Sequence, residues 1–441
     1  MSCRLMALAC LSLLLAACSQ DRPEGSVCKG ICPDDQGPTS LVPSESADKA
    51  ETVSVTASMA DDELQMAIRE LMLEKAAAAP LSAPERALLD LPDMEAARLR
   101  VLALSSGGPF GSFGAGFLNG WSEQTEADLL RPAQFDVVTG VSAGALLSTF
   151  AFLGEERDDD LESQFTSVTT EDIFRERSIF RLLFSNSFVD TAPLRATLET
   201  IVTPALLDEV AAATAAGPDG EAPKRFLLVL AVNLDSGLPR IFDLGRIARE
   251  RDNPDRINDY IDALMASSAI PVAFPPVFID GDMHVDGGAR LALFFNRFME
   301  DQRSKVDGGT APAPKVDIIV NSEITVTPSC TPNTLIGIGA RSIDVVLNQI
   351  TLDSLFRTIS EAERDGADVR YATAEGTNCA PPDDAKDPFA QSFLQCLFDE
   401  GKALGSSQNP FRTGLDEFPK AGINRATSGE AGFVQPACAA G

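Results

Sequence analysis

The sequence predicts an α/β fold with a mostly parallel sheet, because strand patterns of the buried type alternate with helical patterns along the chain. Runs rich in Val, Leu and Ile at residues 135–139, 226–233 and 316–321 have the length and composition of strands that are covered on both faces. Another apolar run begins near Leu99 and ends in a glycine-rich turn. We therefore expect a central sheet with helices packed on both faces.

Composition sets limits on the possible partners of this chain. It has 441 residues, of which 44% are hydrophobic and 23% charged, as in ordinary globular proteins. The 36 Lys and Arg residues are outnumbered by 65 Asp and Glu residues, which gives a formal net charge of -29. Binding to nucleic acid needs clustered cations that displace counterions, so we expect no nucleic-acid partner. The same charge argues against attachment to anionic lipid by a polybasic patch.

The N-terminus has the features of an export signal. Arg4 precedes an apolar run at residues 5–15, which is too short to span a bilayer as a helix. The sequence LAAC that ends at Cys18 resembles the lipobox of bacterial lipoproteins. That resemblance implies that residues 1–17 are a signal peptide and that Cys18 carries acyl chains, which would anchor the protein in the bacterial cell envelope. Ser19 resembles the pattern for the outer membrane if the source is Gram-negative. The alternative is an ordinary secretory signal with a chance cysteine.

The rest of the chain divides by composition into further segments. Residues 18–60 are rich in Pro, Ser, Asp and Gly, which indicates a flexible tether. Helical periodicity within residues 61–98 predicts N-terminal helices. The main domain is expected over residues 99–375, with a long helix at 341–364. Residues 376–441 are rich in Gly, Pro and Asp, and we expect a cysteine-containing, loop-rich C-terminal extension.

Cysteine usage agrees with export. Nine cysteines are present; two would leave with the signal peptide and Cys18 would be lipidated, so 9 - 3 leaves six. An even number in an oxidising compartment predicts disulfides, of which a Cys28 to Cys32 pair would be the most local. Zinc would need three or four ligands, and the single histidine is distant in sequence, so we expect no metal. The six cysteines are Cys28, Cys32, Cys330, Cys379, Cys396 and Cys438.

The strongest chemical signal is FDVVTGVSAGAL at residues 135–146. A strand is followed by Gly-x-Ser-x-Gly and then by a helical run, which is the pattern of a nucleophile elbow. Small neighbours allow the strained turn to present the Ser142 hydroxyl above the sheet. The structural alternative is a tight turn in which Ser142 only caps the helix.

A serine nucleophile needs a base, and His284 is the only histidine. It lies two residues before Asp286, so the two side chains share a face if the segment is a strand. In α/β-hydrolases, however, the histidine follows the acid in the chain. We therefore favour a dyad in which a carboxylate takes the serine proton, and we interpret His284 as structural. Asp280 and Asp282 are rival carboxylates, which we interpret as turn residues.

The segment LSSGGPFGSFGAGFL at residues 104–118 again links a strand to a helix. Backbone N–H groups in such a turn can bind an anion, either a phosphate or the oxyanion of acyl transfer. A Walker loop is excluded because no Lys-Ser/Thr follows, and the dinucleotide spacing is met only loosely. The structural alternative is a turn that allows close helix packing. Its glycines are Gly107, Gly108, Gly111, Gly114 and Gly116.

Together these motifs resemble the patatin-like phospholipases. The resemblance covers roughly residues 99 to 300 and rests on four elements in order: the glycine-rich loop, GVSAG around Ser142, ASSAIPVAFPPV at residues 266–277, and Asp286 followed by two glycines. It implies a three-layer α/β/α fold and hydrolysis of lipid acyl esters by a Ser-Asp dyad, without metal or other cofactor.

Carried onto this sequence, the resemblance makes Ser142 the nucleophile and Asp286 the base. The N–H groups of Gly107, Gly108 and Gly111 would form the oxyanion hole. Phe110 departs from the family, whose members usually have Arg or Lys at this place, and ARLALFF after the Asp-Gly-Gly replaces an Asn-Pro turn. The missing cation favours neutral or zwitterionic substrates.

Two other functional classes stay open at this point. One is a catalytically silent surface lipoprotein that binds a lipid or a partner, although the presence of Ser142, Asp286 and the glycine loop argues against it. The other is an esterase or thioesterase that uses the same dyad on substrates other than lipids.

Overall fold

The structure is a computed structural model that describes residues 98–126, 129–176, 187–215, 225–295, 314–326, 331, 333–364, 366–382 and 387–414. The expected signal peptide, Cys18, the tether, the N-terminal helices up to residue 97 and the Cys28–Cys32 pair lie outside these residues. Within them, no helix combines the length and the apolar character that a membrane span requires.

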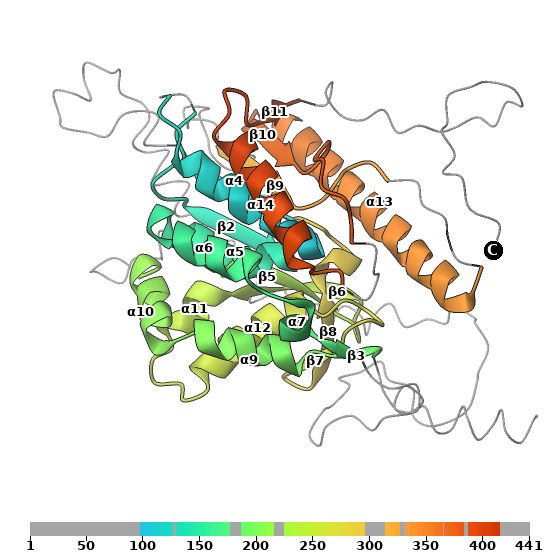
Figure 1. The fold of residues 1–441 in the computed structure, drawn as a ribbon. Helices are drawn as coiled ribbons and strands as arrows, with labels where there is room; N and C mark the ends of the chain where they lie inside the picture. The colour runs from blue at the N-terminus through green and yellow to red at the C-terminus, as the bar shows by residue number, and fades with distance from the viewer. Residues whose placement is uncertain are drawn as a thin grey trace, which may run out of the picture.

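The centre of the fold is a nine-stranded sheet with the order β11-β10-β9-β1-β2-β5-β8-β7, and β6 pairs with β5 (Figure 1). The five strands from β10 to β5 run parallel, whereas β6, β7, β8 and β11 join in antiparallel pairs. The predicted mostly parallel sheet is therefore confirmed. The strands are β1 (Arg100–Leu104), β2 (Val137–Val141), β5 (Phe226–Asn233), β6 (Leu238–Asp243), β7 (Val277–Ile279), β8 (Asp282–Asp286), β9 (Lys315–Val320), β10 (Asp368–Thr373) and β11 (Arg412–Thr413).

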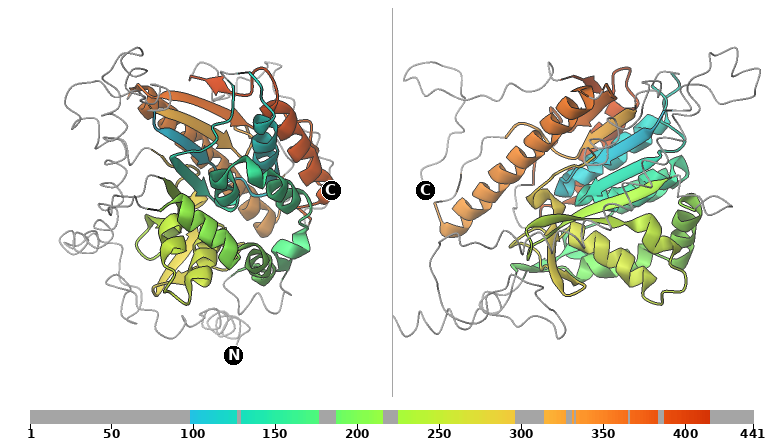
Figure 2. Two further views of the ribbon diagram at one scale, coloured as in Figure 1. Left: turned by 90° about the vertical axis from the view of Figure 1, so that its left-hand side faces the viewer. Right: turned by 180° about the vertical axis from the view of Figure 1, so that it is seen from behind.

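Helices cover both faces of this sheet, as predicted (Figure 2). Leu102 and Leu104 of β1 pack in one hydrophobic core with residues of helices α4, α5, α12 and α14, while Val101 and Ala103 belong to a second core to which α13 contributes. The helices are α4 (Gly111–Ser122), α5 (Ala143–Leu153), α6 (Asp158–Thr166), α7 (Thr170–Ile173), α9 (Ala192–Ile201), α10 (Pro204–Ala213), α11 (Leu244–Arg249), α12 (Arg256–Ser267), α13 (Leu335–Arg364) and α14 (Gln391–Gly405).

Short elements complete the described chain. The strands β3 (Arg175–Glu176) and β4 (Val189–Asp190) form a separate antiparallel pair. Three single turns of 3-10 helix are η1 (Gly108–Phe110), η2 (Glu155–Arg157) and η3 (Gly287–Ala289). The turn η3 directly follows β8, and η1 begins shortly after β1; the sequence places its candidate site residues at both of these points.

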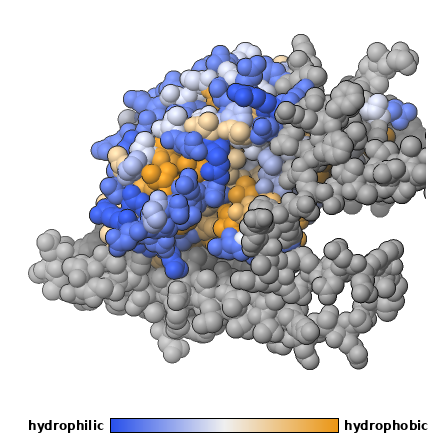
Figure 3. All heavy atoms as spheres, turned by 90° about the horizontal axis from the view of Figure 1, so that it is seen from below, coloured by the Kyte–Doolittle hydropathy of each residue, from blue (hydrophilic) through white to orange (hydrophobic). Residues whose placement is uncertain are grey.

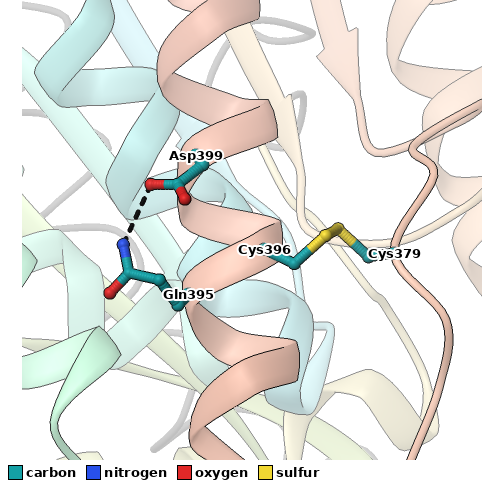
Figure 4. Close-up of a disulfide and its surroundings, with 4 residues drawn as sticks. All are labelled: Cys379, Gln395, Cys396 and Asp399. Atoms are coloured by element: carbon teal, nitrogen blue, oxygen red, sulfur yellow. Dashed lines mark hydrogen bonds between the residues drawn. A yellow bond between two sulfur atoms is a disulfide. The ribbon is translucent and has the colours of Figure 1, made fainter.

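The expectation of loops after residue 376 is wrong for the described part of this segment. Residues 391–405 form helix α14, and β11 adds to the edge of the main sheet. A disulfide between Cys379 and Cys396 joins the chain that follows β10 to the middle of α14 (Figure 4). The segment therefore packs as part of the α/β domain.

Close backbone contact explains how α14 is held. Gly116 of α4 lies against the carbonyl of Phe398, and Gly401 of α14 lies against the carbonyl of Phe113, so a Cβ at either glycine would overlap a backbone oxygen. Gly120 and Gly405 repeat the same contact one turn further along each helix. Only glycine allows two helix backbones to approach this closely.

We predict that Gly401→Ala destabilises the protein by about 1–3 kcal/mol, because the added methyl group overpacks the α4–α14 contact. At an open helical position the same substitution should stabilise by up to ~1 kcal/mol, since alanine has the higher helix propensity. Gly339→Ala in α13 is the control, because no atom lies within reach of its added Cβ. Chemical unfolding of the two variants measures both effects, and equal stabilisation by both would contradict the proposed close packing.

Candidate active site

Ser142 lies in a strained turn between the end of β2 and the start of α5. Its backbone angles are φ 54° and ψ -121°, which a residue with a side chain rarely adopts. The turn packs directly on the end of β1 because Gly144 has no side chain. A Cβ at Gly144 would overlap the carbonyl oxygen of Leu104. The Ser142 side chain makes no capping hydrogen bond to α5. The geometry is that of the predicted nucleophile elbow, and a purely capping role for Ser142 has no support.

Asp286 lies beside Ser142 because β8 pairs with β5, and β5 is the neighbour of β2. The Ser142 side chain lies close enough to the Asp286 carboxylate to lower its pKa, and this carboxylate accepts a hydrogen bond from the N–H of Gly288 at 2.7 Å. The Asp286 N–H is fixed by the carbonyl of Ala269 at 2.8 Å. Both side chains are almost fully buried, with exposures of 5% for Ser142 and 4% for Asp286.

Burial raises the pKa of Asp286 to about 6, while the nearby Ser142 side chain and the hydrogen bond from the Gly288 N–H act in the opposite direction. A carboxyl group with a pKa near 6 is largely ionised at neutral pH, yet it is much more basic than an exposed aspartate. These are the properties that a general base needs.

The hydrogen-bond partners of the single histidine are not Ser142 or Asp286. His284 is buried on β8, where its Nδ1 lies 3.0 Å from the Asp282 carbonyl and its Nε2 lies 3.4 Å from a guanidinium nitrogen of Arg240. Burial, with a further contribution from Arg240, lowers the pKa of His284. His284 is therefore a neutral, buried ring that is hydrogen-bonded away from Ser142. This agrees with the interpretation of His284 as a structural residue and not as the catalytic base.

The rival carboxylates are also engaged away from Ser142. Asp280 forms an exposed ion pair with Arg240 at 2.6 Å. Asp282 accepts a hydrogen bond from the Asn233 side chain at 3.0 Å. Of the carboxylates considered from the sequence, the structure therefore brings only Asp286 to the serine.

Gly108 of the glycine-rich loop lines the same cavity as Ser142. Among the described residues, the N–H groups of Gly107 and Gly108 have no hydrogen-bond acceptor, and Gly108 adopts a left-handed φ of 54°. Gly107 lies against the backbone of Asn321, where a Cβ would overlap the carbonyl oxygen. Gly111 differs, because its N–H already donates to the carbonyls of Gly108 and Pro109. Gly111 is therefore not available as the oxyanion donor that the sequence suggested.

Sequence reasoning assigned no role to two residues that hold the site together. Ser267 Oγ accepts the Ser142 N–H at 3.0 Å and donates to the Leu230 carbonyl at 2.7 Å, which ties the elbow to α12 and β5. Asn321 directly follows β9, and its side-chain amide donates to the Ser105 carbonyl at 2.7 Å. Their positions in the sequence could have pointed to these residues. Ser267 lies within the motif at residues 266–277, and Asn321 follows a buried parallel strand, where binding sites are common.

An apolar cavity of about 350 Å³ lies next to Ser142. An apolar cavity of ~150 Å³ holds one benzene molecule, so this one has room for a chain on the order of ten carbons. Hydrophobic residues also gather on the molecular surface on the side of α9 and β7 (Figure 3). No charged residue lines the cavity among the described residues; its apolar walls include Leu146, Phe150, Phe165, Phe174, Leu194, Leu198, Ile201, Leu206, Leu264, Ile270, Phe274, Phe389 and Leu394.

Two hydrophobic segments contribute to this lining. From the segment at residues 270–278, Ile270, Ala273 and Phe274 line the cavity. Of the Phe-rich stretch at 174–188, Phe174 lines it, whereas residues 177–186 lie outside the described chain. The described residues contain no group of His, Cys, Asp or Glu side chains arranged to hold a metal ion.

Comparison with known proteins gives one family match. Residues 102–298 match the family described as patatin-like phospholipase. No curated protein matches the chain in sequence. Among solved structures, the crystal structure of VipD from Legionella pneumophila is similar at 11% identity and a TM-score of 0.29, over 71% of this chain and 67% of that chain.

We predict that Asp286→Asn stabilises the fold at neutral pH. A pKa raised from 3.8 to about 6 means that the folded state binds the proton more tightly than the unfolded state does. The free energy of unfolding of the wild type therefore falls by about 3 kcal/mol as pH rises through this interval. Asparagine keeps the shape of the side chain without the buried charge. Urea unfolding at pH 4 and pH 7 should show a stability difference between variant and wild type that grows with pH; a difference independent of pH would contradict the raised pKa.

Proposed function

We propose that the protein is a serine hydrolase that cleaves acyl esters of lipids with Ser142 and Asp286, because residues 102–298 match the patatin-like phospholipase family. The observation that carries the proposal is the position of the buried Ser142 side chain beside the buried Asp286 carboxylate, next to an apolar cavity. The family supports lipid acyl hydrolysis at a general level, and the geometry of this pair supports the specific roles.

In the acylation step, Asp286 takes the proton from Ser142 while the serine Oγ attacks the acyl carbonyl carbon. The negative charge that develops on the carbonyl oxygen would be stabilised by the N–H groups of Gly107 and Gly108. When the tetrahedral intermediate collapses, protonated Asp286 gives its proton to the departing alcohol. The acyl group then remains on Ser142 as an ester.

Deacylation repeats the sequence with water. Asp286 removes a proton from a water molecule, whose oxygen attacks the acyl-enzyme ester. The same N–H groups would again hold the oxyanion. Collapse releases the fatty acid, and Ser142 regains a proton from Asp286, so that the resting state is restored without any cofactor.

The local structure supports this division of roles. The strained elbow and the Ser267 contact hold the serine at the end of β2. The burial that raises the pKa of Asp286 makes its carboxylate a stronger base than an exposed aspartate. The cavity offers an apolar site for the acyl chain, because burying methylene groups there removes them from water.

We further propose that Cys18 carries the lipid that anchors the protein in the bacterial cell envelope, after removal of residues 1–17. The support is the LAAC sequence and the apolar run before it. Two or more acyl chains give stable membrane attachment. An anchor of this kind would hold the site near membrane lipids, and these are the substrates that we propose.

We predict that the mature protein reacts with a fluorescent fluorophosphonate and that Ser142→Ala abolishes this labelling. Asp286→Asn should slow the labelling by about 10²–10⁴-fold, because it removes the general base. The control is Asp280→Asn, since Asp280 is exposed and pairs with Arg240 away from the site. A folded wild type that stays unlabelled in the presence of micelles would favour the silent lipid-binding alternative.

We also predict a preference for lipids with neutral or zwitterionic head groups. The described lining of the cavity has no cation, and Phe110 stands where a basic residue is usual among the proteins that this sequence resembles. Phosphatidylcholine should be cleaved at least as fast as phosphatidylglycerol at the same surface concentration in mixed micelles. Faster cleavage of phosphatidylglycerol would contradict the prediction, and turnover of short water-soluble esters alone would favour an esterase that does not act on lipids.

A further inference from the structure

Part of the cavity wall comes from a segment outside the family match. Most of the cavity-lining residues lie between Gly108 and Phe274, but Pro388, Phe389 and Leu394 come from the C-terminal region. The family match ends at residue 298. The acyl site therefore contains a wall that the matched region does not supply. We call residues 387–394 the C-terminal wall.

We propose that this C-terminal wall determines which acyl chain lengths the enzyme accepts, with Phe389 as the main specificity-determining side chain. The inference rests on the proposed function, since it concerns the acyl group that Ser142 would receive. It goes beyond that function because it assigns selectivity to a segment that the motifs of the site do not include.

The first support is the way in which the C-terminal wall is fastened to the matched domain. The N–H of Phe389 donates to the Thr170 hydroxyl at 3.2 Å, and that hydroxyl donates to the Asp387 carboxylate at 2.5 Å. The Gln391 side chain donates to the carbonyl of Ser167 at 3.1 Å. These contacts attach the wall to the start of α7 and to the residues just before it. Its position relative to the cavity is therefore fixed by specific hydrogen bonds.

The second support is the aromatic contact that Phe389 makes. Its ring lies 6.4 Å from the ring of Phe174, which in turn lies 5.8 Å from the ring of Phe274. All three side chains line the cavity. Phe389 thus continues an aromatic surface, and it is only half-buried. Truncation of this ring would add room to the cavity without opening the central hydrophobic core.

The other end of the C-terminal wall reaches the glycine-rich loop. Phe393 of α14 packs edge-to-face on Phe110, with ring centroids 5.8 Å apart. Its neighbour Leu394 is buried and lines the cavity. The disulfide at Cys396 and the glycine contacts between α14 and α4 hold this helix in place (Figure 4). A wall that is fixed at both ends gives the cavity a defined size, which is the condition for selecting by chain length.

The energetics of apolar burial give the size of the expected effect. Each methylene that moves from water into an apolar site changes affinity by roughly fourfold. A change in cavity length of two or three methylenes should therefore change the ratio of long-chain to short-chain activity by roughly tenfold or more. An equal loss of activity on esters of all chain lengths after substitution of Phe389 would show that the C-terminal wall does not select by chain length.

The test compares the full-length wild type with Phe389→Ala, Phe389→Trp and Gln395→Ala. For each protein, kcat/KM is measured on p-nitrophenyl esters from butyrate to palmitate. Phe389→Ala should raise the palmitate-to-butyrate ratio by about tenfold, and Phe389→Trp should lower it. Gln395→Ala is the matched control, because Gln395 lies on the exposed face of α14 and bonds Asp399 (Figure 4). This control should keep the wild-type profile.

A second measurement separates this inference from the proposed function. Binding of octanoate and palmitate is measured by calorimetry in the Ser142→Ala background, with and without Phe389→Ala, so that no catalysis is needed. A higher preference for palmitate in the double variant supports the role of the C-terminal wall even if no ester is hydrolysed. The inference is wrong if Phe389→Ala unfolds cooperatively and leaves both the ester profile and the palmitate-to-octanoate binding ratio the same as in the proteins that retain Phe389. Should Phe389→Ala fail to fold, Phe389→Leu replaces it, with a smaller shift in the same direction.

Discussion

Close backbone contact at the carboxyl ends of the parallel strands is the constraint on which the rest of the site depends. The first turn of α5 lies on the end of β1 at Gly144, and the loop after β1 lies on Asn321 at Gly107. A Cβ at either position would overlap a carbonyl oxygen. With these contacts in place, Ser142 and Gly108 of the glycine loop line the same cavity. Backbone packing thereby brings together the serine and the loop that we propose as nucleophile and oxyanion donor.

The buried carboxylate of Asp286 lowers the stability of the folded protein while it gains the basicity that its proposed role requires. Asp286 is surrounded by protein, so its ionisation costs folding free energy that a solvent-exposed aspartate would not lose. The same burial raises its pKa toward neutrality and keeps the Ser142 hydroxyl as its close partner. The hydrogen bond from the Gly288 N–H limits the cost without removing it. The arrangement suits a base that must accept and return a proton.

The C-terminal helix changes the description of the domain. The composition of residues 376–441 predicts loops, because glycine is common in turns. In the structure, Gly401 and Gly405 lie within α14 and form the contact surface for α4. The helix is long and packed, and its first turn reaches the cavity beside Ser142. A segment beyond the family match thus contributes to the core and to the wall of the proposed acyl site.

The sequence by itself determined the elements whose signals are local. The strand at 226–233 was predicted with the bounds that β5 has, and the elbow, the glycine loop and Asp286 were found because each motif is a few residues long. The tertiary structure alone decided which distant groups meet. The Ser142 N–H bonds Ser267, 125 positions away, and Phe389 joins Phe174 across a still longer separation. The tertiary structure also shows that the Gly111 N–H already donates to backbone carbonyls. Such contacts depend on strand order and helix packing, and a linear pattern of residue types does not record them.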